Sequence, residues 1–263
     1  MFANFEMFVD INNIWCKMSP CEFKGVFMFK EFIDYEMRPI FCPSREICKE
    51  FADIDILCGT LIEKNMFYLC KDLDKMYFDI WNLQRNVSVF AAYLSGKIIG
   101  FTSGFYNGRN MFTNALYVVP EYHGYGIGTS LLNTAENAAT LVAKNMELIS
   151  SDDAVSFYQE RGYKNVVVQE RIVKIKKLSK TIPGVVPVFD WNDKLSAKIN
   201  VKFDTDLLNK CKHQPIFVYV NSEQKIDGIA TRLSNGKDVI SCKSGKDKSF
   251  IDAALSDALG NIR

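Results

Sequence analysis

The spacing of hydrophobic residues changes along the chain and divides it into predicted elements. Between residues 44 and 81 apolar residues recur every three to four positions, which predicts two helices that each bury one face. The first helix is expected to begin after Pro43, with Ser44 as its N-cap residue. The buried faces are expected to contain Ile47, Phe51, Ile54, Cys58 and Leu61 in the first helix, and Leu73, Met76, Tyr77, Ile80 and Trp81 in the second.

From residue 87 the apolar residues alternate with others, which is typical of strands. Residues 87–94 and 97–105, joined by Ser95-Gly96, predict a β-hairpin, and residues 114–119 predict the next strand. Helical spacing then returns, and residues 146–150 predict another strand. A strand–helix–strand crossover of this kind implies a parallel pair. The inner face of the crossover helix is expected to contain Leu131, Leu132, Ala135, Ala138, Ala139 and Val142.

A short helix and two strands are predicted to complete this part of the chain. The helix contains Phe157 and Tyr158 and ends at Gly162, a residue that readily adopts the left-handed conformation at helix C-termini. Residues 165–168 and 171–178 predict the closing strands, and residues 35–41 predict a strand before the first helix. We therefore expect an α/β fold, of the α+β kind with a mixed sheet.

A glycine-rich segment connects the strand at 114–119 to the crossover helix. It reads Pro-Glu-Tyr-His-Gly-Tyr-Gly-Ile-Gly over residues 120–128. Glycines at alternate positions leave the backbone without Cβ atoms, so successive N–H groups can turn toward one anion, and the positive end of the following helix adds to the attraction. This segment predicts a binding site for a phosphate-bearing ligand, although glycines at such a junction also serve ordinary tight turns.

Two motifs resemble those of the GCN5-related N-acetyltransferases, the GNAT superfamily. His123-x-x-Gly126-x-Gly128 is similar to the acetyl-coenzyme A loop of that family, which reads Arg/Gln-x-x-Gly-x-Gly/Ala. Residues 154–163 are similar to the second motif, a helix with Phe-Tyr that ends at Gly-Phe or Gly-Tyr. The resemblance implies the GNAT acyl-CoA N-acyltransferase fold over residues 35–178. It also implies acetyl-CoA as acyl donor, no metal, and direct attack of an amine on the thioester.

The resemblance assigns roles to particular residues. Tyr158 matches the general acid that protonates the departing thiolate, and a phenol with a pKa near ~10 stays protonated at neutral pH; the alternative is a core aromatic residue whose hydroxyl merely finds a partner. Ser151 stands where many family members have Asn, although it is equally suited to be a helix N-cap, as are Asp152 and Asp153. The residues expected to bind the coenzyme are Leu116, Tyr117, Val118 and Val119 along pantetheine, His123, Gly124, Tyr125, Gly126, Ile127, Gly128 and Thr129 around the pyrophosphate, and Ser151.

The sequence departs from the family pattern at two places. His123 replaces Arg or Gln, so a mostly neutral imidazole takes the place of a permanent charge or an amide. The strand at 114–119 has no Glu where several GNAT enzymes keep a general base. Glu121 and Glu147 are near in sequence, but both are more typical of solvated surface charges.

The remaining tail, residues 184–263, contains an internal repeat. Residues 97–109 align without a gap on residues 225–237, and the matched Lys, Ile, Gly, Asn and Gly each lie 128 positions from their partners. A fixed long period favours duplication, although two unrelated hairpins ending in Asn-Gly would also look alike. A strand at 239–242 and a helix at 250–259 follow, without a glycine cradle. We therefore expect a second, smaller and degenerate GNAT-like half that does not bind coenzyme by itself.

Composition limits the remaining possibilities. The chain has 263 residues, 48% hydrophobic and 24% charged, with a formal charge of +1, so it lacks the basic character of nucleic-acid-binding proteins. The eight cysteines form no Cys-x-x-Cys pair and only two histidines are present, which favours reduced thiols over a zinc site. No stretch approaches the ~20 apolar residues of a membrane span, and residues 1–14 do not resemble a secretory signal. We expect a cytoplasmic protein whose partner is a small-molecule or peptide amine.

Other interpretations stay open at this level. Strand, glycine loop, helix and Glu147 superficially match a dinucleotide-binding unit, but Thr129 stands where the third glycine is required. A GNAT-shaped module that binds coenzyme or peptide without turnover is a second alternative. The basic residues of 171–180 predict a solvent-facing strand edge rather than a phosphate site. Residues 1–34 form an extension to which no role is assigned.

Overall fold

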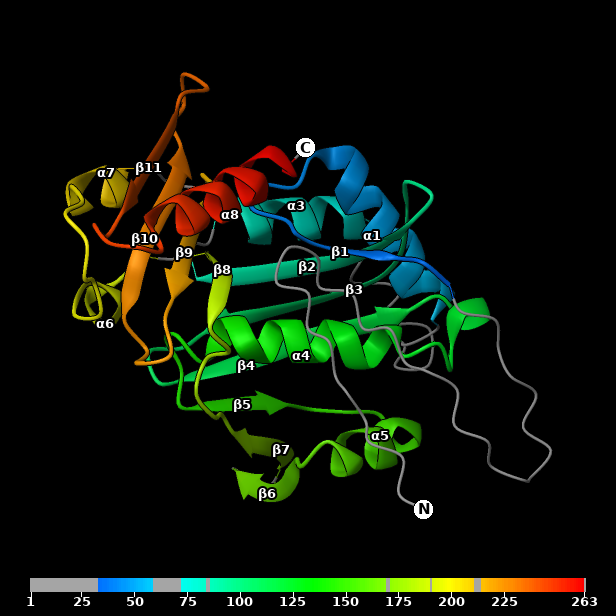
Figure 1. Ribbon diagram of the computed structural model, residues 1–263. Coiled ribbons are helices and arrows are strands. Elements are labelled where there is room, and N and C mark those ends of the chain that lie inside the picture. The colour runs from blue at the N-terminus through cyan, green and yellow to red at the C-terminus, as the bar shows by residue number, and fades with distance from the viewer. Residues whose placement is uncertain are drawn as a thin grey trace, which may run out of the picture.

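The computed structural model describes residues 33–58, 72–83, 86–168, 171–189, 191–210 and 214–262. In these parts of the chain a seven-stranded sheet has the order β1-β2-β3-β4-β5-β7-β6, and a four-stranded sheet has the order β11-β10-β9-β8. Figure 1 shows α4 lying along the larger sheet and the orange and red C-terminal elements gathered at one side of it. The extension at 1–34, apart from its last two residues, and Leu61 lie outside the described residues.

The larger sheet follows the predicted order of elements. Its strands pair antiparallel except for β4 and β5, which are parallel, as the crossover predicted. The elements are β1 (Glu36–Pro39), α1 (Arg45–Leu57), α3 (Leu73–Leu83), β2 (Val87–Leu94), β3 (Lys97–Tyr106), β4 (Asn110–Val118), the 3-10 helix η2 (Pro120–Tyr122), α4 (Ile127–Ala139), β5 (Asn145–Leu148), the 3-10 helix η3 (Asp152–Ala154), α5 (Val155–Glu160), β6 (Lys164–Val168) and β7 (Arg171–Lys177).

Local signals explain several of these boundaries. The Ser44 side chain accepts a hydrogen bond from the Ile47 N–H and caps α1, as predicted. Ser95 and Gly96 have φ angles of 50° and 81°, which suit the tight turn between β2 and β3. Gly162, with φ at 84°, follows the end of α5, which confirms the predicted left-handed position.

The two faces of the larger sheet bury separate hydrophobic clusters. One cluster joins the sheet to α4 and α5 and includes Leu131, Leu132, Leu148 and Tyr158. The other joins it to α1 and α3. Met76 was expected on the buried face of α3 but is exposed. The buried residues Leu73, Tyr77 and Trp81 repeat every four positions, so Met76 lies beside the buried face rather than on it.

Strand β4 is longer than expected at its start. It begins at Asn110 rather than Asn114. In its pairing with β3, Ser103 lies opposite Ala115 and Gly104 opposite Thr113, so Asn114 is an extra residue in a β-bulge. Beyond the bulge, odd-numbered and even-numbered residues exchange the faces of the sheet to which they point. The alternation of apolar and polar residues therefore does not continue across the bulge.

The basic residues of β7 do not form a solvent-facing edge. Strand β7 lies between β5 and β6, so β6 covers the side that was expected to be open. Lys174 is 4% exposed, and its Nζ lies 3.4 Å from the Asn165 Oδ1. Lys176 forms an ion pair of 2.6 Å with Glu136 of α4, which also accepts a hydrogen bond from the Tyr163 hydroxyl. For these two lysines the prediction of an exposed edge was wrong.

The C-terminal part forms the four-stranded antiparallel sheet. Helix α8 packs on this sheet through Ile251, Leu255 and Leu259, which contact Phe217 and Ala230. The strand and helix expected at 239–242 and 250–259 are both present, each slightly longer than expected. The elements are β8 (Gly184–Val188), α6 (Asp193–Ser196), α7 (Thr205–Lys210), β9 (Ile216–Val220), β10 (Ile226–Arg232), β11 (Asp238–Cys242) and α8 (Lys248–Gly260).

Candidate active site

Strands β4 and β5 separate at the centre of the larger sheet. Their parallel pairing runs from Asn110 opposite Asn145 to Thr113 opposite Leu148 and goes no further. Beyond it β4 continues to Val118, paired with β3 on its other side. Of the residues expected along pantetheine, 116–119, the first three therefore lie where the described strands leave one edge of β4 without a strand partner, and Val119 follows the end of the strand. An extended amide-bearing ligand can pair with such an edge as an added strand would.

Two buried hydroxyls lie near the point of separation. Thr113 is 5% exposed, and neither its Oγ1 nor the Oγ of Ser150 has a hydrogen-bond partner in the described parts of the chain. Thr113 belongs to the last pair of the parallel ladder, and Ser150 follows β5 by two residues. Buried hydroxyls normally have partners, so these two indicate room for a polar ligand at this point.

Ser151 interacts with a residue of the following 3-10 helix. It precedes η3, and its side chain does not cap that helix. A hydrogen bond with Ser151 lowers the pKa of the Asp153 carboxyl. The neighbouring Ser150 was not among the sequence candidates, and only its position as the last residue of the strand predicted at 146–150 could have drawn attention to it.

The glycine cradle combines turn glycines with an uncapped helix end. Gly124 and Gly126 have φ angles of 85° and 80°, in the left-handed region that favours glycine. Gly126 is the N-cap residue of α4, no side chain caps this end, and the first turn contains no acidic residue. The first N–H groups of α4 are therefore available to an anion. Tyr125 is half-buried against the α4 cluster, and the Ile127 side chain is buried in it, so we expect Ile127 to contribute only its backbone to an anion.

Gly128 has a different role from the other two glycines. It lies within α4, and a Cβ at this position would come within 3.6 Å of the Phe157 ring. This distance is an ordinary van der Waals contact, so a Cβ would fit, whereas a larger side chain would meet Phe157 of α5. The first turn of α4 and α5, which carry the two motifs of the sequence, are therefore neighbours.

The His123 side chain is hydrogen-bonded to the end of strand β4. Its Nε2 lies 2.8 Å from the Val118 carbonyl oxygen, which can only accept, so Nε2 carries the hydrogen. The Cys58 thiol donates to the same carbonyl over 3.5 Å. One ring nitrogen of His123 thus holds the cradle against the end of β4, a role that the sequence did not suggest.

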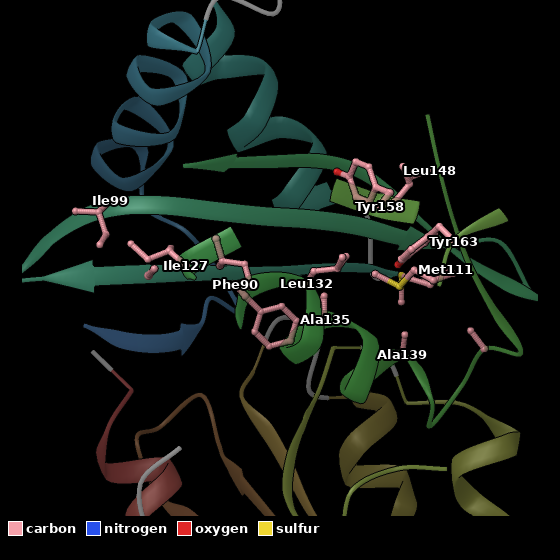
Figure 2. Packing of buried hydrophobic residues seen from close by; sticks show 14 residues of the cluster. Phe90, Ile99, Met111, Ile127, Leu132, Ala135, Ala139, Leu148, Tyr158 and Tyr163 are labelled. Carbon is pink, nitrogen blue, oxygen red and sulfur yellow. The ribbon is translucent and has the colours of Figure 1, made fainter. Parts of the chain in front are cut away.

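The Tyr158 side chain extends from α5 into the hydrophobic cluster that joins the larger sheet to α4 and α5. It is 7% exposed, packs edge-on against Phe157 and Tyr163, and lies beside Leu148 at the end of β5 (Figure 2). Burial raises the pKa of its phenol to about 12. The hydroxyl makes no hydrogen bond with any described residue, and it is not one of their fully buried polar atoms, so it reaches the accessible side of the cluster.

The two carboxylates near β4, those of Glu147 and Asp55, have different hydrogen-bond partners. Glu147 accepts a hydrogen bond from the Asn110 side chain at the start of β4, away from the point of separation. Asp55 of α1 is 3% exposed; its Oδ2 accepts from the Tyr77 hydroxyl over 2.6 Å, and its Oδ1 has no partner among the described residues. Burial raises the pKa of the Asp55 carboxyl, and the neighbouring Tyr77 and Tyr117 hydroxyls act in the opposite direction. The one signal that could have found Asp55 in the sequence is its place as an acidic residue beside Ile54 on the apolar face of α1.

A cavity of about 30 Å³ lies elsewhere. Ser88 and Met111 of the larger sheet, Leu141 after α4, and Val188 and Asn192 of the C-terminal part contribute to its lining. No residue of the cradle lines it. It belongs to the junction between the two sheets, and we assign it no role in the chemistry.

The described parts of the chain contain neither a cluster of metal ligands nor a membrane-spanning helix. These parts contain no group of three or more His, Cys, Asp or Glu residues placed to hold a metal ion. They also contain no helix long and apolar enough to cross a membrane. Of the eight cysteines, Cys42, Cys48, Cys58 and Cys242 are described, and all four are free thiols.

Comparison with known proteins identifies the family of the central segment. Residues 85–165 match the family model described as an acetyltransferase (GNAT) domain. No curated protein matches the chain. Among solved structures, the chain is similar to PaiA N-acetyltransferase from Thermoplasma acidophilum, in complex with coenzyme A, with 18% identity over 55% of this chain and 99% of that one and a TM-score of 0.42.

Two further structures give similar values. An acetyltransferase from Streptococcus agalactiae has 14% identity over 55% of this chain and 98% of that one, with a TM-score of 0.46. The ribosomal-protein-S18-alanine N-acetyltransferase from Escherichia coli has 13% identity over 57% and 97%, with a TM-score of 0.42. The matched segment, 85–165, contains β4, the cradle, α4, β5 and the Tyr158 helix. Residues 85–165 of this chain are a GNAT acetyltransferase domain.

Proposed function

We propose that the protein is an acetyl-CoA-dependent N-acetyltransferase in which an acceptor amine attacks the thioester directly. The observation that carries the proposal is the Tyr158 hydroxyl, which makes no hydrogen bond with the described residues, is not among their fully buried polar atoms although the residue is only 7% exposed, and lies beside the end of β5, where β4 and β5 separate. Because the hydroxyl is accessible and is not used by another side chain, it is free to donate to the coenzyme sulfur. The family match of residues 85–165 supports the same conclusion.

The residues of the chain fit the parts of acetyl-CoA. The N–H groups at the start of α4, with the Thr129 hydroxyl, would hold the pyrophosphate, and the open edge of β4 at 116–118 would pair with the amides of pantetheine. Acetyl-CoA supplies an activated acyl group as a thioester. The protein orients that group and the amine, and positioning of two reactants can contribute ~7–11 kcal/mol.

Different groups would donate the proton to the thiolate and remove the proton from the amine. Tyr158, with a pKa raised to about 12, stays protonated at neutral pH and would donate its proton to the thiolate. Strand β4 carries no carboxylate in the stretch that lies beyond its pairing with β5. We therefore expect the acceptor amine to lose its proton to water or to arrive neutral.

The experiment is an assay of acetyl-CoA consumption, read as released thiol, against a panel of small amines and peptide amino termini. Turnover above the rate without acceptor is expected. Coenzyme binding without turnover against any acceptor would favour the alternative, a GNAT-shaped binding module. That alternative rests on the replacement of the cradle Arg or Gln by His123 and on the missing base.

We also propose that the C-terminal sheet is a degenerate copy of the first half of the GNAT domain. Strands β9, β10 and β11 form an antiparallel meander followed by a helix, as β2, β3 and β4 do. A bulge places Ala92 opposite Gly100 and Tyr93 opposite Ile98, and another places Tyr219 opposite Gly228 and Val220 opposite Ile226. Both bulges, and both glycines, are separated by the same 128 positions as the sequence repeat.

The two glycines also serve the same packing contact. A Cβ at Gly100 would lie 2.8 Å from the Tyr117 carbonyl oxygen of β4 and 3.3 Å from the Leu131 side chain of α4, and one at Gly228 would lie 2.6 Å from the Ile251 side chain of α8. Each glycine therefore lets the helix that follows its meander approach the middle strand. The equivalent bulge and the equivalent helix contact support duplication over a chance similarity of two hairpins. The copy has no second cradle, and we assign it a stabilising role.

A further inference from the structure

Arg161 lies between the two motifs of the domain. It follows α5 directly, and its side chain reaches the first turn of α4. Its Nε and Nη2 donate to the Thr129 Oγ1 over 3.2 and 2.6 Å, and its Nη1 donates to the Phe157 carbonyl oxygen over 2.6 Å. The guanidinium also stacks on the Phe157 ring, 3.8 Å from its centroid. These contacts fix the position of a permanent positive charge at the cradle.

The charge of Arg161 has little compensation from the protein. Its ion-pair partner in the described parts of the chain is Glu160, at 3.6 Å, and the Glu160 side chain is 74% exposed. A water-exposed pair of this kind contributes little. The first turn of α4 contains no acidic residue, and the positive end of the helix dipole lies at the same place. Two positive features side by side repel each other unless an anion binds between them.

The hydrogen bonds of Arg161 also prepare Thr129 to donate. A hydroxyl oxygen has two lone pairs and one hydrogen. Because Oγ1 accepts from both Nε and Nη2, its own hydrogen is left to point away from the guanidinium. Of the five N–H groups of Arg161, three are used in the hydrogen bonds to Thr129 and Phe157, and two are left for a ligand.

We propose that Arg161 binds the pyrophosphate of the coenzyme and supplies a permanent positive charge there. One His123 ring nitrogen is engaged by the Val118 carbonyl, whereas Arg161 is permanently charged and contacts the residue expected to donate to the phosphates. The proposal rests on the proposed function, because it names a residue of the same coenzyme site. It commits to the pyrophosphate rather than the 3′-phosphate, since Thr129 belongs to the first turn of α4.

The test measures dissociation constants of coenzyme A and of 3′-dephospho-coenzyme A by calorimetry. The proteins are wild type, Arg161→Gln, Arg161→Lys, and Lys164→Gln as a control with the same change of charge at an exposed residue of β6. We expect Arg161→Gln to weaken both ligands equally, by roughly 10- to 100-fold, as the loss of a charge-assisted hydrogen bond does. Arg161→Lys should restore part of the affinity, and Lys164→Gln should match wild type.

Added salt separates an electrostatic role from a structural one. The difference between wild type and Arg161→Gln should shrink as salt screens the charge. A loss confined to coenzyme A would assign Arg161 to the 3′-phosphate and overturn the pyrophosphate assignment. An equal, salt-independent loss in Arg161→Gln and Arg161→Lys, with lowered thermal stability, would show that Arg161 only packs α5 against α4. Unchanged affinity in Arg161→Gln would also overturn the proposal, whereas failure of wild type to bind coenzyme A would overturn the proposed function itself.

Discussion

Replacement of Tyr158 by phenylalanine is the most informative test of the proposed chemistry. The hydroxyl makes no hydrogen bond with the described residues, so its removal should change the free energy of unfolding by less than about 0.5 kcal/mol. If the hydroxyl protonates the thiolate, its loss should lower kcat by ~10²–10⁴-fold with little change in coenzyme affinity. The structure thus predicts loss of turnover without loss of stability.

The raised pKa adds a prediction about pH. An ordinary tyrosine, with a pKa near ~10, would be half ionised at pH 10 and would lose half of its acid form. With a pKa of about 12, Tyr158 would be only ~1% ionised at pH 10. The pH profile of kcat should therefore show no fall that depends on Tyr158 up to pH 10.

Tyr163→Phe is the matched control. The Tyr163 hydroxyl donates to the Glu136 carboxylate over 2.9 Å, so its removal should destabilise the fold by ~1.5–3 kcal/mol, the range for a bond to a charged group, and leave kcat unchanged. The measurements are steady-state release of thiol and thermal unfolding of both variants. Normal turnover in a destabilised Tyr158→Phe protein would refute the reasoning and make Tyr158 a packing residue. A fall of kcat near pH 10 in wild type that is absent in Tyr158→Phe would refute the raised pKa.

Three further substitutions test other parts of the structure. Gly126→Glu should abolish coenzyme binding measured by calorimetry, whereas Gly108→Glu, which has a similar positive φ outside the cradle, should bind normally; equal affinity in both would remove Gly126 from the site. Gly228→Ala should lower the free energy of unfolding by ~1–3 kcal/mol because its Cβ would lie 2.6 Å from Ile251, whereas Gly260→Ala, where a Cβ meets nothing within 4 Å, should not; equal stabilities would contradict the close contact with α8. Burial raises the folded-state pKa of Asp55, so wild type should lose stability relative to Asp55→Asn as pH rises above the unfolded-state pKa near ~4, until the folded carboxyl is fully ionised. Chemical unfolding from pH 4 to 8 measures this loss. The same change of unfolding free energy with pH in both proteins would show that the carboxyl is not desolvated.

Much of the larger sheet could be predicted from hydrophobic spacing because its elements have strong local signals. Ser44 caps α1, Ser95-Gly96 forms the turn between β2 and β3, and Gly162 follows α5, each in the predicted role. The Asn114 bulge was not predictable in this way. It depends on pairing with β3, and a bulge changes the side to which residues point without a distinct sequence pattern.

The sequence by itself determined the order of elements, the cradle glycines and the two motifs that place residues 85–165 in the GNAT family, because each depends on residues close together in the chain. Only the tertiary structure decided which side chains meet across the two motifs. Arg161 contacts Thr129, His123 turns to Val118, and Lys174 is covered by β6, and none of these contacts follows from local spacing. Burial and hydrogen bonding arise when distant segments pack, so the charge at the cradle and the pKa of Tyr158 are properties of the fold.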